Sequence, residues 1–396
     1  MGIEETEQKR QDRLLRNVLF TFFVSGAASQ SLGALLPVMR ESYGFSYDFQ
    51  GLLLSCQSVG NLAAVLLTGF LPAYLGRRRT ILSTAGWMAA GYLIFTCGTG
   101  APAFLLAACV MMGVARGSNA NFSNTVVSTL PAEKSARGFN LLHGAFAVGA
   151  LLSPLLLVLC SFRRGGWRLM TGILFLMCLC QFGVYAKMDL PAEGGTKEKK
   201  GPDPSFLKVK QFWLGTAILF FYMSTEYAIT GWLVTYFLDV GILPAELAQM
   251  TNSLLWLVIF AGRMVGAAVT GRVSRNSLLV VDGIGFFLFF LLMFFSRTPG
   301  VVVLALAGAG FFMATIYPTA FAFGSEYIKG NDLGNSVMIL TGSAGGILTP
   351  SLVGFVAERT GNIQSGMALV AVYTGLLLVC ILFSVWSVRG DSGKRE

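Results

Sequence analysis

The chain has 396 residues, of which 54% are hydrophobic and only 12% are charged, and its mean hydropathy is +0.67. A soluble globular domain carries roughly a quarter charged residues, so the composition excludes a soluble protein and predicts an all-α polytopic membrane protein. The net charge of +9 does not indicate a nucleic-acid partner, because the basic residues lie in short polar segments that set membrane topology. The expected partner is the lipid bilayer.

Twelve apolar segments follow one another along the chain. Crossing a bilayer takes roughly 20 apolar residues. Because a backbone in lipid must satisfy its own hydrogen bonds, we predict that each segment is a transmembrane helix. The segments are residues 15–38, 51–73, 80–99, 103–128, 139–161, 167–186, 211–238, 248–270, 277–296, 300–323, 334–357 and 366–388.

The Lys and Arg residues predict how these helices are oriented. With the N-terminus inside, 21 of the 29 basic residues fall on the cytoplasmic side and six outside, while two lie within helices. Cytoplasmic loops are enriched in basic residues, so both termini are predicted to be cytoplasmic. Residues 1–17 do not resemble a cleaved signal peptide. We expect a monomeric, multi-pass protein of the plasma membrane, specifically a bacterial inner membrane.

A polar stretch at residues 187–210 divides the segments into six and six. Its Lys, Gly and Pro content predicts a flexible linker. We predict an N-terminal six-helix half at 1–190, a cytoplasmic linker at 191–209 and a C-terminal six-helix half at 210–396. The fifth and eleventh segments share a pattern, Gly149-Ala-Leu-Leu-Ser-Pro154 and Gly345-Gly-Ile-Leu-Thr-Pro350. Such duplication is typical of transporters with a binding site between two repeats.

The turn after the second segment contains Gly69, Gly76, Arg77 and Arg78. Together with the division into six and six, these residues resemble the Gly-x-x-x-Asp-Arg-x-Gly-Arg-Arg signature of the major facilitator superfamily. The resemblance implies that family's twelve-helix fold and a gating role for the four residues. In the family the Asp helps to latch the cytoplasmic gate, but here Ala73 replaces it. The latch is therefore absent from this chain or uses another acid.

Four stretches resemble one branch, the fucose/glucose–cation symporters. They are residues 140–154, 221–236, 262–266 and 317–319. Fucose–proton symporters also carry one acid in the first segment and one in the fourth, where this chain has Gly33 and Ala120. The resemblance implies a sugar as substrate, but the absence of both acids argues against simple transfer of the fucose mechanism. It leaves Glu226 as the main candidate for coupling.

Glu226 lies in the middle of the uncharged stretch 212–238. A carboxylate at the bilayer centre costs about 2.5 to 3.5 kcal/mol, so its presence indicates a use. On a helix, Tyr222 and Thr230 share its face. We predict that Glu226 carries a proton or binds sugar hydroxyls. The alternative is a structural ion pair with Arg116 or Arg263.

The two intramembrane arginines allow several roles. An arginine stays protonated and needs a partner. Arg116, midway along the fourth segment, could pair with Glu226 in coupling, tie helices together or bind an anionic substrate. Arg263 lies nearer the cytoplasmic end of the eighth segment, and we expect a gate or packing residue there.

Amide side chains form polar stripes on three helices of the N-terminal half. Amides offer a donor and an acceptor to each sugar hydroxyl, and they also hydrogen-bond between helices. We predict that the stripes line a polar cavity. The predicted substrate-binding residues are Gln30, Gln57, Asn61, Asn121 and Asn124, together with Tyr222 and Trp232, which could stack on a sugar ring or pack in the core.

His143 is the only histidine. It lies about one turn inside the cytoplasmic end of the fifth segment, where capping or gating is a simpler role than proton carriage. Asp282, similarly shallow in the ninth segment, is expected to be structural.

The sequence contains no enzyme constellation. One histidine leaves no His-based metal cluster, and no GxxxxGK[ST] phosphate loop occurs, so we expect no cofactor and no metal site, with H+ or Na+ as the possible coupling ion. The prediction is a secondary active transporter, not an enzyme, that imports a monosaccharide by alternating access with H+ coupling. An exporter of drugs or organic anions, a Na+-coupled or uncoupled sugar carrier, and a membrane sensor remain alternatives.

Overall fold

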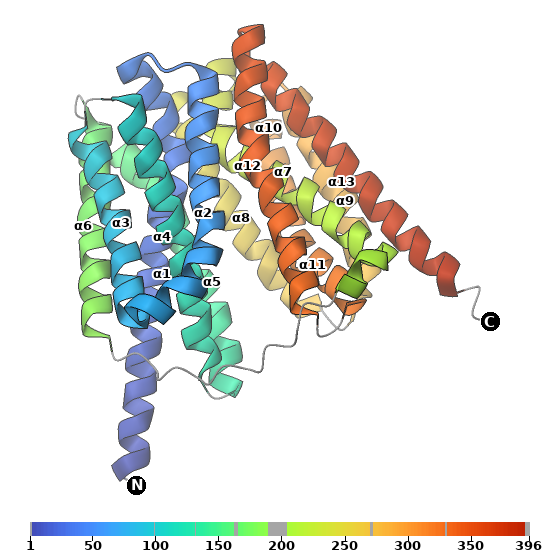
Figure 1. Ribbon diagram of the computed structural model, residues 1–396. Helices are drawn as coiled ribbons and strands as arrows, with labels where there is room; N and C mark the ends of the chain where they lie inside the picture. The colour runs from blue at the N-terminus through green and yellow to red at the C-terminus, as the bar shows by residue number, and fades with distance from the viewer. Residues whose placement is uncertain are drawn as a thin grey trace. The chain divides into compact units, whose positions relative to one another are not determined.

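The computed structural model describes residues 2–98, 100–130, 132–161, 165–188, 204–269, 272–328 and 331–392. Helices joined by short connections make up these residues (Figure 1). The helices are α1 Gly2–Tyr43, α2 Tyr47–Leu75, α3 Arg77–Cys97, α4 Pro102–Ser128, α5 Ala132–Cys160, α6 Gly166–Lys187, η1 Pro204–Lys208, α7 Lys210–Val240, α8 Ala245–Val269, α9 Arg275–Phe295, α10 Pro299–Met313, α11 Ile316–Glu326, α12 Asp332–Thr360 and α13 Ile363–Ser392.

The predicted fold class, an all-α polytopic membrane protein, is confirmed. Within the described residues, eleven helical stretches have the length and apolar composition to cross a membrane. The 29-residue helix α2 corresponds to the remaining predicted segment. Helices α10 and α11 together occupy the tenth segment, because the helix is interrupted at Ala314 and Thr315.

Several helices extend beyond the apolar segments that predict them. Helix α1 begins at Gly2 and α5 at Ala132, both within polar sequence. Hydropathy marks only the lipid-facing length of a helix, whereas the backbone ladder can continue into water because its hydrogen bonds are internal.

The chain forms two compact units. The first contains residues 1–44 and 56–196, and the second contains residues 45–55 and 197–396. The start of α2, residues 47–55, thus belongs to the second unit, although most residues of the first unit follow it in the sequence. Residues 189–203, which include most of the predicted linker at 191–209, lie outside the described residues, so the linker remains a prediction.

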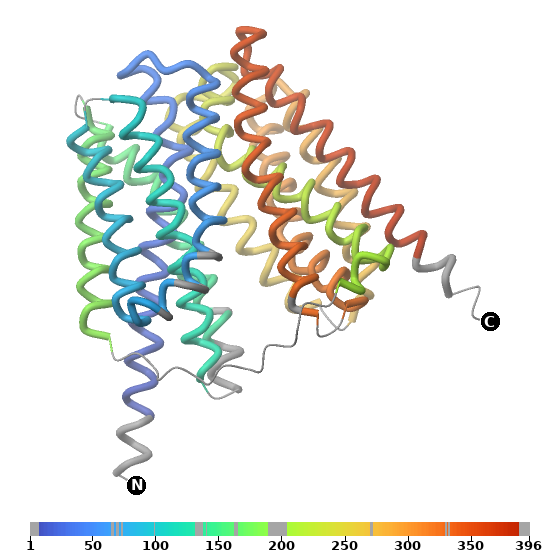
Figure 2. Tube along the Cα trace, viewed as in Figure 1, coloured from blue at the N-terminus to red at the C-terminus, as the bar shows by residue number. Residues whose placement is uncertain are grey.

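Each unit contains a pair of helices, equivalent in the repeated sequence pattern, that packs with almost no space between the backbones. In the first unit α1 and α5 lie side by side (Figure 2), and a Cβ atom at Gly149 would lie 2.0 Å from the Phe23 carbonyl oxygen. In the second unit α7 and α12 are paired, and a Cβ atom at Gly345 would lie 2.4 Å from the Phe220 carbonyl oxygen. The two glycines of the repeated sequence pattern therefore have the same packing role.

Candidate functional site

The Glu226 region of the second unit is a cluster of phenol and carboxyl groups. Glu226 is half-buried on α7, one turn from the fully buried Tyr222. Its carboxylate lies close enough to the Tyr222 hydroxyl to interact electrostatically, although among the described residues that hydroxyl has no partner with hydrogen-bond geometry. Thr230, expected on the same face, donates instead to the Glu226 carbonyl oxygen at 2.8 Å. Tyr222 and Glu226 therefore lie within electrostatic range of each other on α7, and the predicted roles of both residues stay predictions.

Two further elements contribute to this cluster. Tyr317, at the start of α11, has its ring centroid 6.0 Å from that of Tyr222 and interacts electrostatically with Glu226 and Tyr227. Arg263 of α8 also lies in electrostatic range of the Tyr222 hydroxyl. The cluster of Tyr222, Glu226, Tyr227, Arg263 and Tyr317, here called the Glu226 cluster, thus draws on α7, α8 and α11.

The start of α11 is held in place by close packing from α8. A Cβ atom at Gly262 would lie 2.6 Å from the Phe311 carbonyl oxygen, and one at Gly266 would lie 2.3 Å from Cγ2 of Thr315. Larger residues would therefore displace the interruption between α10 and α11, which positions Tyr317.

The predicted amides of the first unit lie in varied surroundings. Gln30 and Gln57 are buried, and Gln57 donates to the Ser29 carbonyl oxygen at 3.5 Å. Asn61 is half-buried beside Gly117. Asn124 is half-buried, and among the described residues its Oδ1 has no hydrogen-bond partner. Asn121 is exposed and donates to the Thr68 hydroxyl at 3.0 Å.

A buried polar network of the first unit was missed by the sequence analysis. Asn119 Oδ1 accepts hydrogen bonds from the hydroxyls of Tyr185 and Ser123, and its Nδ2 donates to the Thr21 carbonyl oxygen at 3.2 Å. Gln181 donates to the same carbonyl at 3.2 Å. The network joins α1, α4 and α6. Asn119 and Ser123 are four residues apart, so their spacing on one helix face was the available signal.

Three other predicted residues have distinct environments. Trp232 is fully buried, and its indole N–H donates to the Pro350 carbonyl oxygen at 3.0 Å, which is the environment of a core residue. His143 is exposed, with its ring 6.1 Å from that of Phe22. Arg116 is half-buried on α4. It belongs to the first unit and Glu226 to the second, so their predicted pairing stays a prediction.

The predicted gating turn connects α2 with α3. Gly69 lies within α2, and Gly76 precedes α3 with φ +76°, a conformation that favours glycine. The Arg77 guanidinium lies 5.3 Å from the Phe122 ring centroid, and Arg78 donates to the Ala186 carbonyl oxygen. The two arginines therefore attach this turn to α4 and α6.

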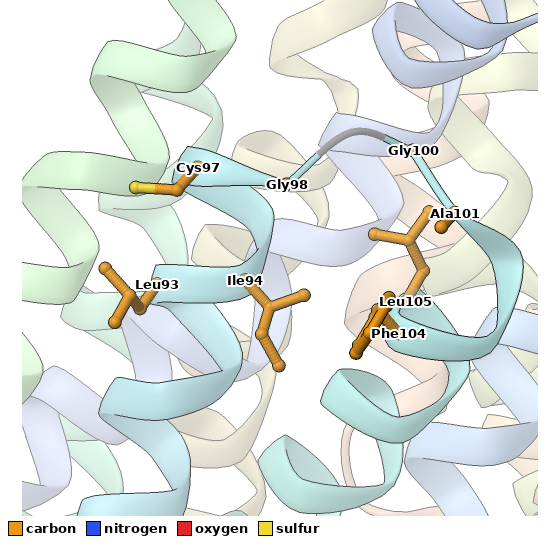
Figure 3. Close-up of a pocket in the computed structure, with 8 residues that line it drawn as sticks. All are labelled: Leu93, Ile94, Cys97, Gly98, Gly100, Ala101, Phe104 and Leu105. Carbon is orange, nitrogen blue, oxygen red and sulfur yellow. The ribbon is translucent and has the colours of Figure 1, made fainter.

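The structure also contains a cavity between α3 and α4, and none of the predicted site residues lines it. Among the described residues, no three His, Cys, Asp or Glu side chains are grouped to hold a metal ion. The cavity has a volume of about 320 Å³ (Figure 3). Its lining is Leu93, Ile94, Cys97, Gly98, Gly100, Ala101, Phe104 and Leu105. This lining offers no charged group to a polar substrate.

Comparison with known proteins identifies the family. The model of the Major Facilitator Superfamily matches residues 18–350. An uncharacterized MFS-type transporter of Yersinia pestis is 22% identical over 347 residues, which are 85% of this chain and 87% of that protein. The L-fucose-proton symporter of Escherichia coli is 27% identical over 169 residues, 41% of this chain and 37% of its own.

Solved structures agree on the fold. The crystal structure of the Escherichia coli fucose:proton symporter FucP has a TM-score of 0.62 at 19% identity, covering 93% of this chain and 98% of that one. That of the nucleoside transporter NupG has a TM-score of 0.76 at 13% identity, covering 95% and 99%. With the family model spanning most of its length, this chain belongs to the Major Facilitator Superfamily of membrane transporters.

Proposed function

We propose that this transporter imports a monosaccharide together with a proton, and that Glu226 binds the proton. The observation that carries the proposal is the Glu226 cluster, a carboxylate held in the membrane among three phenols and one arginine. Structural packing alone gives little reason to place a carboxylate there, because apolar side chains fill the same space at lower cost.

Protonation of Glu226 provides a physical basis for coupling. In its charged form the carboxylate would hold water or a counter-charge near it, and the nearest arginine in the cluster, Arg263, lies in electrostatic range of the neighbouring Tyr222 hydroxyl. In its neutral form it can lose that water at much lower cost, because transferring a neutral carboxyl group to an apolar environment costs far less than transferring a carboxylate. The transporter would then change conformation more readily with the proton bound, as alternating access requires.

A sugar substrate is supported by the polar groups of the first unit and by the fucose–proton symporter among the relatives. Asn124 Oδ1 is an acceptor available for a hydroxyl group, and Asn61 and Gln30 offer both donors and acceptors. Asn121 and Trp232 are weaker candidates, because their polar groups already bond to Thr68 and Pro350.

The test is uptake into proteoliposomes from a panel of labelled monosaccharides and nucleosides. Each compound is offered with no gradient, with an imposed pH gradient and with a Na+ gradient. We expect one monosaccharide to accumulate only with the pH gradient. The variant Glu226→Gln should exchange that sugar across the membrane but not accumulate it.

The matched control is Glu246→Gln, which removes an exposed carboxylate from the first turn of α8. It should accumulate sugar as the wild type does. Accumulation by Glu226→Gln equal to that of the control would disprove coupling at Glu226. Accumulation driven by Na+, or of a nucleoside alone, would replace the proposed ion or substrate.

A further inference from the structure

A second carboxyl group is buried in the second unit, apart from Glu226. Asp282 lies on α9, and only 6% of its surface is exposed. It is seven residues from Arg275 at the start of the helix, which places it roughly 10 Å along the axis. Among the described residues no cation forms an ion pair with Asp282, and Arg275 pairs with Glu326. A carboxylate in this setting is expensive to keep charged.

The hydrogen-bond donor to Asp282 is the hydroxyl of Thr315. Thr315 is one of the two residues that interrupt the tenth span, between the end of α10 at Met313 and the start of α11 at Ile316. A neutral hydroxyl can donate to a carboxylate or to a protonated carboxyl group, so it permits both states without neutralising the charge.

The same interruption leads directly into the Glu226 cluster. Tyr317 follows Thr315 by two residues, its ring lies against Tyr222, and it interacts electrostatically with Glu226. Thr315, at the interruption, therefore supplies the hydroxyl that contacts Asp282, and Tyr317, in the first turn of α11, supplies a phenol of the Glu226 cluster. Interrupted helices are where transporters place their ion sites.

We infer that Asp282 is a second proton-binding carboxyl group, linked to the Glu226 cluster through Thr315 and Tyr317. The inference rests on the proposed proton coupling and adds a place to which the proton moves. The step is a proton transfer: the O–H bond of the protonated Glu226 breaks and leaves a carboxylate, an O–H bond forms on a carboxylate oxygen of Asp282, and Asp282 later gives that proton to water and returns to its carboxylate form.

Few other titratable side chains lie on the described parts of the helices around Asp282. Helices α10, α11 and α13 pack against α9. The described part of α10 contributes no titratable side chain, and α11 contributes Tyr317 and Glu326, both described above. On α13, Tyr373 contacts Phe221 of α7, and the half-buried Cys380 lies between Leu378 and Ile381, which line the α9 surface at Gly283. None of these supplies a cation to Asp282; the side chains of Arg389 and Asp391, at the far end of α13, lie outside the described ones.

The experiment measures protonated carboxyl groups directly, by infrared difference spectroscopy of the protein in vesicles titrated from acid to alkaline pH. Asp282→Asn keeps an oxygen for Thr315 but removes the carboxyl group. Thr315→Val removes the donor, and Thr315→Ser restores it. Glu246→Gln is again the exposed control. We expect one carboxyl band to vanish in Asp282→Asn only and to shift in Thr315→Val but not in Thr315→Ser.

The link to Glu226 has its own readout, since Glu226→Gln should shift the titration midpoint of the Asp282 band. An unchanged midpoint would disprove the link, and a spectrum unaltered by Asp282→Asn would disprove proton binding at Asp282. If the wild type transports no sugar, the proposed function fails, yet the infrared titration still decides whether Asp282 binds a proton. If sugar uptake succeeds, Asp282→Asn should exchange the sugar but not accumulate it along a pH gradient.

Discussion

The network around Asn119 and the Glu226 cluster are two polar regions of the described structure, and they are built differently. Asn119 is neutral, buried to 2% exposure, and bonded through both its amide oxygen and its amide nitrogen. The Glu226 cluster contains a carboxylate, an arginine and a fully buried phenol without hydrogen-bond geometry to any described residue. In the first region both ends of the Asn119 amide are bonded and only Gln181 Oε1 lacks a partner among the described residues, whereas in the second the ionisable cluster includes the unbonded Tyr222 hydroxyl.

The difference indicates that the Glu226 cluster can change its conformation more easily than the Asn119 network. A buried network joined through one side chain, as this one is through Asn119, favours one arrangement, because displacing that side chain breaks several hydrogen bonds at once. A cluster with an unsatisfied hydroxyl and an ionisable group has alternatives, since protonation or a bound solute can complete it. We therefore expect mutations in the two regions to change the free energy of unfolding by different amounts and, in one case, in opposite directions.

The largest effect is expected where the two units are alike, at the glycines between paired helices. Gly149→Ala should lower the free energy of unfolding by about 3 kcal/mol and Gly345→Ala by about 2 kcal/mol, because each added methyl group meets a backbone carbonyl oxygen. Reversible unfolding in mixed micelles measures both. Gly183→Ala on α6 is the control, since a Cβ atom there meets nothing within 4 Å. A loss at Gly183 equal to that at Gly149 would contradict the packing argument.

A smaller loss is expected from Asn119→Ala, which leaves the Tyr185 and Ser123 hydroxyls and the Thr21 carbonyl oxygen without this partner. Its cost should be about 2 kcal/mol in the same unfolding assay. Asn121→Ala on the exposed face of α4 should cost well under half as much, because it removes one bond to Thr68. Equal losses of unfolding free energy in the two variants would show that burial of the Asn119 network does not add to stability.

The smallest expected effect concerns two buried tyrosines, whose replacement by phenylalanine should change the free energy of unfolding in opposite directions. Tyr185→Phe removes a hydroxyl that donates to Asn119 and should destabilise by about 1 kcal/mol. Tyr222→Phe removes a hydroxyl with no hydrogen-bond partner among the described residues, so it should leave stability unchanged or raise it by up to about 1 kcal/mol. Thermal unfolding of the purified variants gives the sign. Destabilisation by both would remove the contrast between the regions.

Much of the fold could be predicted because a bilayer leaves few choices for the backbone. The twelve apolar segments correspond to helices, and the shared Gly149 and Gly345 pattern corresponds to equivalent helix contacts. Glu226 could be singled out from its cost alone, and Tyr222 from helical spacing. The interruption at Ala314 and Thr315 was missed because residues 300–323 read as one apolar run, although Pro318 was its signal, since a proline has no N–H to donate to the carbonyl of residue 314 and its ring crowds that carbonyl.

Asn119 shows why the amides were harder to assign. Asn119, Asn121 and Asn124 lie on one helix and have the same chemistry, yet the first is buried in a network, the second is exposed and the third has an acceptor to spare. Which of them faces another helix depends on the rotation of α4 about its axis. That rotation is set by contacts with α1, α3 and α5, which a single sequence does not specify.

The assignment of Phe45–Ser55 to the second unit has a consequence for fragment complementation. The Tyr47 hydroxyl donates to Asp239 at 2.6 Å, its backbone N–H donates to Glu358 at 2.7 Å, and Gly51 lies against the Pro350 carbonyl. A polypeptide ending before η1 would carry this segment without those acceptors. When the piece ending before η1 and the piece beginning there are co-expressed as separate chains, we expect them to associate through residues 45–55 of the first piece. The first piece would then donate the start of α2 to the second, as a pilin subunit donates a strand to its neighbour.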